Sequence, residues 1–280
     1  MKSLSGCCVF IVLLFALPNC ARSQTEVIKG TVIIIGVTKD QVVVAADSRA
    51  TSKDGHRDDD CKISAFGNKL VFASAGIRKF DLAGKFAMNW DSHEVARTAS
   101  LDQTKNVEAK ASDWGTSSAS ILGPPASADP AKFMRELDTH GRIITVGVFA
   151  GLDPSGEIDA TYAKVLIDPS AREAAHVVTY VVQQNEMGSL PIRWTIIGEA
   201  AIASEFLADK TTRARSAWAT RNPSLMKNSL REQVALNAVQ LVKWTIQYGP
   251  PSVGGMVDEI MVDNEGSHWI HKKDICSSRE

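Results

Sequence analysis

The sequence predicts an α+β domain: a four-layer α/β/β/α sandwich of two antiparallel sheets flanked by helices. Two observations lead to this fold class. Clusters of apolar, β-branched segments alternate with helical blocks, and turn residues separate the strands within each cluster. The 280 residues contain no linker or internal repeat, and a single domain of that size can bury a large core.

The first strand cluster is a hairpin. Residues 32–37 and 41–46 are continuous runs rich in valine and isoleucine, and Lys39-Asp40 between them provides the turn. Continuous rather than alternating apolar residues indicate strands that are buried on both faces. Residues 51–60 are polar and charged, which predicts a loop.

The remaining elements follow from hydrophobic period and turn signals. Residues 91–128, rich in Ser, Ala and Asp, show no clear pattern. The helix at 228–247 has the clearest three- to four-residue repeat, and Gly249-Pro250-Pro251 ends it. Further strands are expected at 69–76, 143–150, 160–167, 177–182, 194–197, 256–262 and 267–271, and further helices at 77–90, 130–140 and 198–207.

The N-terminal segment 1–23 is expected to be a signal peptide. Lys2 precedes an apolar run from Val9 to Leu17, and Ala21-Arg22-Ser23 fits the small-x-small cleavage rule. The run is too short to span a bilayer as a helix. We therefore expect a secreted or periplasmic protein with no integral membrane segment after signal removal. A retained anchor, or a lipid attached at Cys20, is the less favoured alternative.

Two cysteines lie beyond that segment, Cys61 and Cys276. In an oxidising compartment they could form a disulfide, and two separate buried thiols fit the sequence at least as well. The formal net charge is −1, which gives no electrostatic reason to expect nucleic acid as a partner.

Several familiar motifs are absent from the sequence. It contains no G-x-S-x-G, no H-E-x-x-H, no P-loop and no G-x-G-x-x-G. None of the six histidines is spaced like a pair of metal ligands on a helix. We therefore expect no cofactor and no metal site.

One remaining constellation of residues does resemble a known family. The strings are Gly30-Thr31-Val32, the run V-V-V-A-A-D-S-R-A-T at 42–51, Lys62-Ile63 and Ser74-Ala75-Gly76. They resemble the β-type subunits of the proteasome and, more widely, the N-terminal-nucleophile (Ntn) hydrolases. The match covers most of the chain after residue 30, except 91–128 and 205–228.

The resemblance implies an Ntn hydrolase-like fold and a threonine-type peptidase or amidohydrolase. The bond between Gly30 and Thr31 is the implied processing site, because the freed α-amine of Thr31 would take the proton as its Oγ attacks an amide carbonyl. Lys62 would lower the cost of negative charge on Oγ, and Asp47 would hold Lys62 charged. The backbone N–H of Gly76 would donate to the oxyanion.

The same resemblance sets the expected boundaries: a short propeptide at 24–30 and one domain at 31–276. Arg49 would fix the loop near Asp47 rather than act chemically. Ser252 is a candidate support for the α-amine.

The later half departs from the family's pattern. The family's first supporting position falls on Gly198-Glu199-Ala200, which has no serine, and its later aspartate and serine positions fall on Pro250 and Val253, unless a one-residue slip lets Ser252 serve. Glu199 and Asp258 are possible substitutes.

Three functions therefore stay open. The chain is an exported threonine peptidase or amidohydrolase, a non-catalytic assembly or binding protein on the same fold, or a non-proteolytic amidase. The expected partner is a peptide or small amide, and either a homo-oligomer or a monomer is expected in solution.

Overall fold

The structure is a computed structural model that describes most of the chain beyond residue 30. The expected signal peptide and propeptide, including Gly30, lie outside the described residues, as does the expected helix at 130–140 apart from Phe133. The described residues are 31–52, 55–82, 88–129, 133, 143–167, 175–182, 193–199, 201–208 and 230–277.

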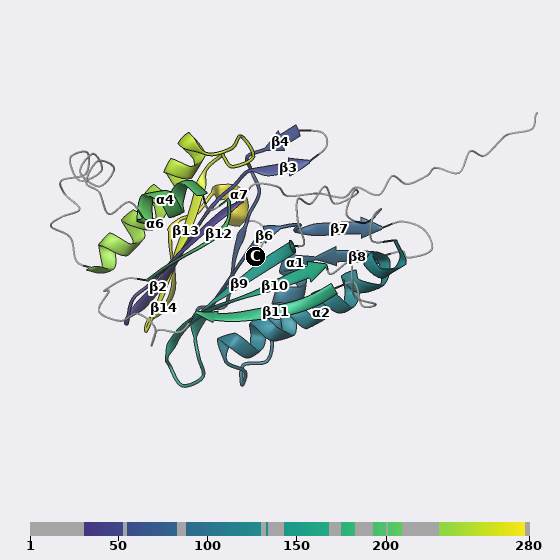
Figure 1. The fold of residues 1–280 in the computed structure, drawn as a ribbon. Coiled ribbons are helices and arrows are strands. Elements are labelled where there is room, and N and C mark those ends of the chain that lie inside the picture. The colour runs from purple at the N-terminus through teal and green to yellow at the C-terminus, as the bar shows by residue number, and fades with distance from the viewer. Residues whose placement is uncertain are drawn as a thin grey trace, which may run out of the picture.

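Two five-stranded antiparallel sheets form the centre of the molecule (Figure 1). The first sheet, in spatial order, is β12 (Arg193–Gly198), β1 (Val32–Val37), β2 (Gln41–Asp47), β13 (Val257–Asp263) and β14 (Gly266–His271). The second is β11 (Ala175–Val182), β10 (Ile158–Ile167), β9 (Ile143–Leu152), β6 (Leu70–Gly76) and β5 (Ile63–Phe66). Two small hairpins join β3 (Ala50–Ser52) to β4 (Gly55–Arg57) and β7 (Lys79–Leu82) to β8 (Met88–Asp91).

Helices cover the outer face of each sheet (Figure 1). α4 (Ala201–Ala208) and α6 (Leu230–Tyr248) pack on the first sheet, and α1 (Ser92–Ser100) and α2 (Val107–Ala128) pack on the second. A short helix, α7 (Asp274–Ser277), ends the described chain. The layers therefore run helices, sheet, sheet, helices, which confirms the predicted fold class.

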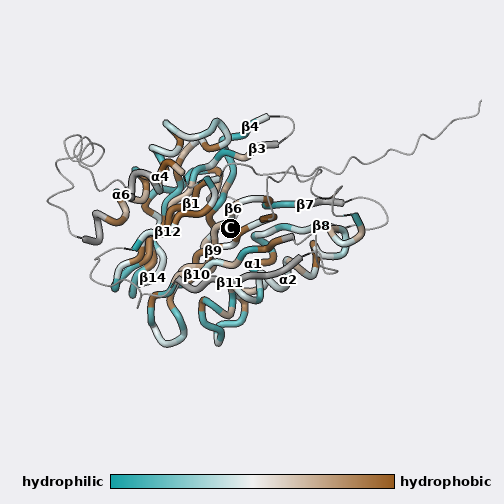
Figure 2. Tube along the Cα trace, viewed as in Figure 1, coloured by the Kyte–Doolittle hydropathy of each residue, from teal (hydrophilic) through white to brown (hydrophobic). Residues whose placement is uncertain are grey.

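The two faces of β1 explain its uninterrupted apolar sequence. Ile33 and Ile35 point into the core between the sheets, whereas Val32 and Ile34 point into the core under α6. All four side chains are at most 1% exposed. Figure 2 shows the corresponding hydrophobic colour along β1 and β12. The prediction of a hairpin buried on both faces is confirmed.

The prediction of a helix at 77–90 is wrong. This stretch contains the β7–β8 hairpin, in which Lys79 pairs with Asp91. The Lys79 Nζ also lies 2.9 Å from Asp91 Oδ2. Trp90 is 1% exposed, and its Nε1 donates to Ser118 Oγ on α2 at 3.3 Å. The hairpin depends on this contact with a distant helix, which a local hydrophobic period cannot reveal.

Residues 91–128 contain α1 and α2, although their sequence showed no clear period. Side chains cap both starts: Asp91 accepts from the N–H of His93, and Asn106 accepts from the N–H of Ala109. The apolar stripe of α2 is hard to recognise because small residues and two internal prolines interrupt it. Trp114 anchors α2 in the core, fully buried among aromatic rings.

Candidate active site

Four strand ends of the first sheet meet beside Thr31. The residue directly precedes β1, and antiparallel pairing places the start of β1 opposite the ends of β2 and β12. Val32 pairs with Gly198 on β12, and Asp47 at the end of β2 pairs with Val257 at the start of β13. Segments far apart in the sequence therefore meet at one edge of the sheet.

Lys62 and Gly76 occupy corresponding positions in the second sheet. Lys62 directly precedes β5, Gly76 ends β6, and the two strands pair antiparallel. The backbone of Ser74 donates to the carbonyl of Lys62 at 3.2 Å. The same end of each sheet thus carries the residues that the sequence singled out.

Asp47 links these two groups of strand ends. Its Oδ1 accepts from the Lys62 Nζ at 2.9 Å and from the Val32 N–H at 3.0 Å. Its Oδ2 accepts from the backbone of Gly254 at 3.1 Å and of Arg49 at 3.2 Å. Asp47 is fully buried, so these four donors replace the water that the carboxylate loses.

Lys62 is buried with Asp47 as an ion pair. Its side chain is 1% exposed. Burial lowers the pKa of Lys62 below its ordinary value, and the charge and hydrogen bond of Asp47 oppose that shift. The ammonium and the Val32 N–H share one oxygen of Asp47, which places the ammonium near the start of β1.

Thr31 has a fixed backbone and an unpartnered hydroxyl. The residue is 2% exposed, and no described residue forms a hydrogen bond to its Oγ1. Its carbonyl accepts from the backbone N–H of Glu199 at 2.9 Å. An added Cβ at Gly198 would lie 1.8 Å from that carbonyl oxygen, so only glycine lets β12 approach Thr31 so closely.

The structure assigns a different reason to the glycine at position 76. Gly76 has φ +89°, and an added Cβ would lie 2.6 Å from the carbonyl oxygen of Ile144. Backbone conformation and the approach of β9 therefore require this glycine, whether or not a substrate carbonyl also lies close.

Arg49 joins the loop beside Asp47 to neighbouring segments. Its guanidinium binds both carboxylate oxygens of Asp58, at 2.6 and 2.8 Å, and its Nη1 donates to the carbonyl of Pro251 at 2.8 Å. The hydrogen bonds from Arg49 lower the pKa of Asp58. The arginine thereby joins the end of β2 to the turn before β13.

The proposed support from the later half is not seen in the side chains. Among the described residues, no hydrogen bond joins Ser252 to Thr31, and Val253 is buried with the apolar core under α6. Asp258 pairs with Lys273 instead, whose Nζ lies 2.6 Å from its Oδ2. Backbone groups make the contacts here: the N–H of Glu199 reaches Thr31, and that of Gly254 reaches Asp47. Sequence could not identify them, because a backbone donor has no residue signature.

A cavity of about 360 Å³ lies beside the Lys62 segment. Asp60, Cys61 and Ile63 line it, together with His93 and side chains of both charges. His93 lies between two hydroxyls, with Nδ1 2.7 Å from Ser64 Oγ and Nε2 3.2 Å from a second serine Oγ. Burial lowers the pKa of His93 well below its ordinary value, so its ring is neutral at pH 7.

The two cysteines are joined, which resolves the alternatives that the sequence left open. Cys61 and Cys276 form a disulfide across 215 residues, with a Cα–Cα distance of 5.6 Å. The bond ties α7 to the residue immediately before Lys62.

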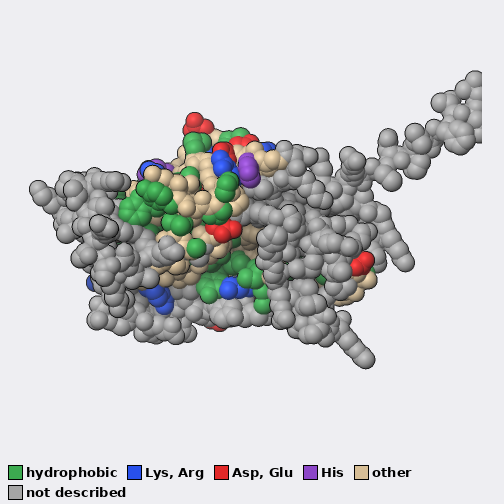
Figure 3. All heavy atoms as spheres, turned by 45° about the horizontal axis from the view of Figure 1, so that its top comes forward, with side chains coloured by type: hydrophobic (Ala, Val, Ile, Leu, Met, Phe, Trp, Pro, Cys, Tyr) green, Lys and Arg blue, Asp and Glu red, His purple; other side chains and the backbone are tan. Residues whose placement is uncertain are grey.

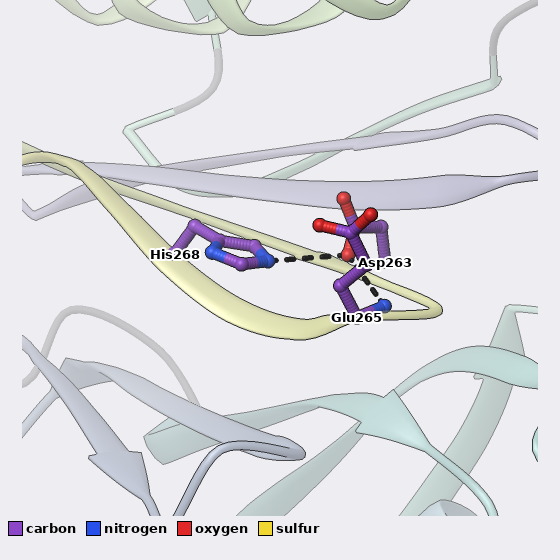
Figure 4. A group of neighbouring side chains, drawn as sticks. All are labelled: Asp263, Glu265 and His268. Carbon is purple, nitrogen blue, oxygen red and sulfur yellow. Dashed lines mark hydrogen bonds and ion pairs between the residues drawn. The ribbon is translucent and has the colours of Figure 1, made fainter.

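One group of possible metal ligands occurs among the described residues, at the β13–β14 turn (Figure 4). Asp263 Oδ1 accepts from the N–H of Glu265 at 2.9 Å and lies 3.3 Å from Nε2 of His268. These contacts close the turn, so they account for the cluster without an ion. The expectation of no metal site stays a prediction.

Two features of the described residues concern possible partners: the length of the apolar helices and the distribution of surface charge. None of the helices that the structure describes is long and apolar enough to cross a membrane. Acidic and basic side chains lie intermixed on the described part of the face in Figure 3. The peptide or amide substrate stays a prediction.

Comparisons with known proteins support the fold. No family model matches the sequence, and no curated protein matches it. One similar solved structure is Anbu (ancestral beta-subunit) from Yersinia bercovieri, with 13% identity and a TM-score of 0.51 over 88% of this chain and 89% of that chain. Another is the Anbu (Gly-1) mutant from Hyphomicrobium sp. strain MC1, with 16% identity and a TM-score of 0.47 over 88% and 87%. At such identities the likeness concerns the fold alone.

These findings correct the family assignment that the sequence motifs favoured. The chain is not shown to be a β-type proteasome subunit or a member of the wider Ntn hydrolase family; the solved structure that supports its fold is an Anbu protein, at 13% identity. The physical reason lies in Asp47, whose four hydrogen bonds hold the strand ends together. The motif around Asp47 therefore reflects how the two sheets are joined. A protein of another family that joins its sheets in this way can contain the same motif. The chain therefore has an α+β, proteasome-like fold similar to that of the Yersinia Anbu structure.

Proposed function

We propose that this protein is an exported threonine-type peptidase or amidohydrolase that uses Thr31 as its nucleophile once the Gly30–Thr31 bond is cut. One observation carries the proposal. A buried lysine, held 2.9 Å from a buried aspartate, shares that aspartate's oxygen with the backbone of the residue after Thr31. Burying a charge pair costs desolvation energy, which here the close contact and the further hydrogen bonds of Asp47 offset. The unpartnered hydroxyl of Thr31 lies at the same strand end.

The proposed reaction begins when cleavage frees the α-amine of Thr31. That amine, with an ordinary pKa near ~8, accepts the proton of Oγ as the oxygen attacks an amide carbonyl. The Lys62 ammonium stabilises the charge that develops on Oγ, and the Gly76 N–H stabilises the oxyanion. The C–N bond then breaks, the leaving amine takes the proton, and water hydrolyses the resulting ester.

The cavity beside Lys62 offers a place for part of the substrate. Its lining carries acids, bases and the neutral His93, so a polar group suits it better than an apolar one. The volume of about 360 Å³ is within the range of small-ligand sites.

Export is supported by the signal-like segment 1–23 and by the disulfide. Structural disulfides persist in oxidising compartments and are rare in the cytosol. Cleavage after Ser23 would leave residues 24–30 as the propeptide. Assembly into a homo-oligomer is consistent with the description of the Yersinia protein as a beta-subunit.

The N-terminus of the mature protein tests this function directly. We expect intact-mass and N-terminal peptide spectrometry of the purified protein to show Thr31 as the first residue. A panel of peptides and small amides should then be hydrolysed by wild type and not by Thr31→Ala.

The same experiment separates the alternatives. A persistent N-terminus at Gln24, with no hydrolysis of any panel member, would reject the proposal and favour a non-catalytic binding protein. Hydrolysis of small amides alone would identify a non-proteolytic amidase. Thr31→Ser is the conservative control, because it retains a hydroxyl and should process more slowly rather than not at all.

A further inference from the structure

The described C-terminal segment is fastened beside Lys62 in two ways. Cys276 is bonded to Cys61, which directly precedes Lys62. Lys273 contacts the same segment, with its Nζ donating to the carbonyl of Asp60 at 2.6 Å. Two residues of one C-terminal turn therefore hold the two residues that lead into Lys62.

The same turn is also anchored in the first sheet. The Nζ of Lys273 lies 2.6 Å from Oδ2 of Asp258, and its backbone N–H donates to Oδ1 at 3.1 Å. Asp258 lies on β13, which pairs with β2, the strand that ends at Asp47. Both charged side chains are at most 2% exposed. The C-terminal turn thus bridges the strand beside Asp47 and the segment that carries Lys62.

We propose that Lys273 and the Cys61–Cys276 disulfide form a C-terminal clasp that positions Lys62 against Asp47, so that the site at Thr31 is complete only in the oxidised protein. The proposal rests on the proposed function for its catalytic consequence. In the proposed reaction neither Lys273 nor the disulfide touches a reacting atom, so Lys273, Cys61 and Cys276 are positioning residues.

The chemistry of opening the clasp needs only a thiol reductant. Two thiols supply two electrons and two protons; the S–S bond breaks, Cys61 and Cys276 become thiols, and the reductant becomes a disulfide. Both cysteines line the cavity beside Lys62, which offers a small thiol a route to the sulfurs. In an exported protein, formation of the bond would complete the site only after export.

The reactivity of the Lys62 amine shows whether the clasp is closed. Burial is the main cause that lowers its pKa, and the nearby charge of Lys273 adds to the shift. Opening the clasp should admit water to the Lys62 ammonium and loosen its contact with Asp47. Its amine should then react faster with an acylating reagent.

The experiment labels lysines of the purified full protein with an amine-reactive reagent, before and after reduction with dithiothreitol, and follows each site by peptide mass spectrometry. We expect reduction to speed labelling of Lys62 by about tenfold or more, as for a local opening. Lys110 is the internal control, because it is 5% exposed and its Nζ donates to the carbonyl of Lys105, away from the clasp. No acceleration at Lys62 would overturn the clasp. An equal acceleration at Lys110 would also overturn it, because the disulfide would then stabilise the whole fold rather than position Lys62.

A second arm separates the clasp from the hydrolase hypothesis. If wild type hydrolyses peptides, reduction should lower kcat by about tenfold with a smaller effect on KM, and reoxidation should restore it. If no substrate is hydrolysed, the labelling result still shows whether the clasp positions Lys62. A Cys61→Ala/Cys276→Ala variant should label rapidly at Lys62 with and without dithiothreitol; slow labelling in both states would contradict the proposal.

Lys273 has its own test. The variant Asp258→Asn/Lys273→Met removes both charges of the buried pair, so no unpaired charge is left. We expect Lys62 to be labelled faster than in wild type, because loss of the Lys273 Nζ contact with the Asp60 carbonyl loosens the segment that carries Lys62. Lys272→Met is the matched control, since the Lys272 Nζ lies over the ring of Trp269 instead. An unchanged labelling rate of Lys62 in the double variant would exclude Lys273 from the clasp.

Discussion

Gly198 lies so close to Thr31 that an added Cβ would be 1.8 Å from the carbonyl oxygen of Thr31. The same carbonyl accepts the N–H of Glu199, the next residue. The end of β12 therefore holds the candidate nucleophile from the backbone side, and any side chain at position 198 would push the two strands apart.

This relationship predicts a large effect for Gly198→Ala. Gly198 has φ +87°, so alanine would add conformational strain to the clash. We expect a loss of about 3 kcal/mol or more in the free energy of unfolding, measured by urea denaturation. We also expect the Gly30–Thr31 bond to remain uncut, so that Thr31 does not become the first residue.

Gly156→Ala is a close control for that prediction. Gly156 has nearly the same φ, +85°, and an added Cβ would meet nothing within 4 Å. Its cost should be the strain alone, about 1–2 kcal/mol. Equal losses in the two variants would show that the contact with Thr31 does not matter.

The buried pair of Asp47 and Lys62 predicts strong coupling. Lys62→Met leaves a buried carboxylate without its cation and should cost about 3–5 kcal/mol. Asp47→Asn should cost a similar amount. The double variant should lose clearly less than the sum, because no unpaired charge remains. Urea denaturation of the four proteins measures the coupling, and simple additivity would contradict the ion pair.

The unpartnered hydroxyl of Thr31 predicts that the nucleophile costs stability. Thr31→Val keeps the shape and removes a buried hydroxyl that has no partner among the described residues. We expect the free energy of unfolding to stay equal or rise by about 1 kcal/mol, while processing and hydrolysis are lost. Thermal and urea unfolding check the first part, and mass spectrometry checks the second.

Thr145→Val is the matched control for that variant. Thr145 is also fully buried, and its Oγ1 donates to the carbonyl of Ala75 at 3.3 Å. Losing that bond should cost about 1 kcal/mol. If both valine variants were destabilised alike, Thr31 would have a structural partner in solution and the prediction would fail.

Glu259 predicts a pH dependence of stability. Its side chain is 1% exposed, Oε1 has no partner among the described residues, and burial raises its pKa to about 8. The folded state therefore keeps a proton that the unfolded state releases above its ordinary pKa of 4.5. The stability that this proton provides is complete below 4.5 and is lost as the pH rises towards 8, by at most about 1.4 kcal/mol per pH unit.

Glu259→Gln should remove this slope. The glutamine is uncharged at every pH, so the free energy of unfolding of the variant should vary less between pH 5 and 8 than that of wild type. Two other groups face Glu259: the Nδ1 of His271 lies 3.4 Å from its Oε2, and the charge of Lys243 favours its ionised form. Parallel pH profiles of wild type and variant would show that Glu259 titrates normally.

The sequence determined the alternation of strands and helices, and hence the α+β fold. The short, β-branched apolar run at 32–37 and the turn residues after it indicate a strand with both faces buried, which requires layers on either side. It also determined that Asp47 ends the second predicted strand, whereas the strand that follows Lys62 was seen only in the structure. Local chemistry sets these features, so they can be recognised from neighbouring residues alone.

Only the tertiary structure decided what those residues touch. The β7–β8 hairpin depends on the contact of Trp90 with α2, and the pairing of Cys61 with Cys276 depends on a turn 215 residues away. Thr31 and Asp47 receive contacts from the backbone N–H groups of Glu199 and Gly254, which no residue type encodes. Contacts between distant segments arise when whole layers pack, and the residues near each site in the sequence carry no signal of them.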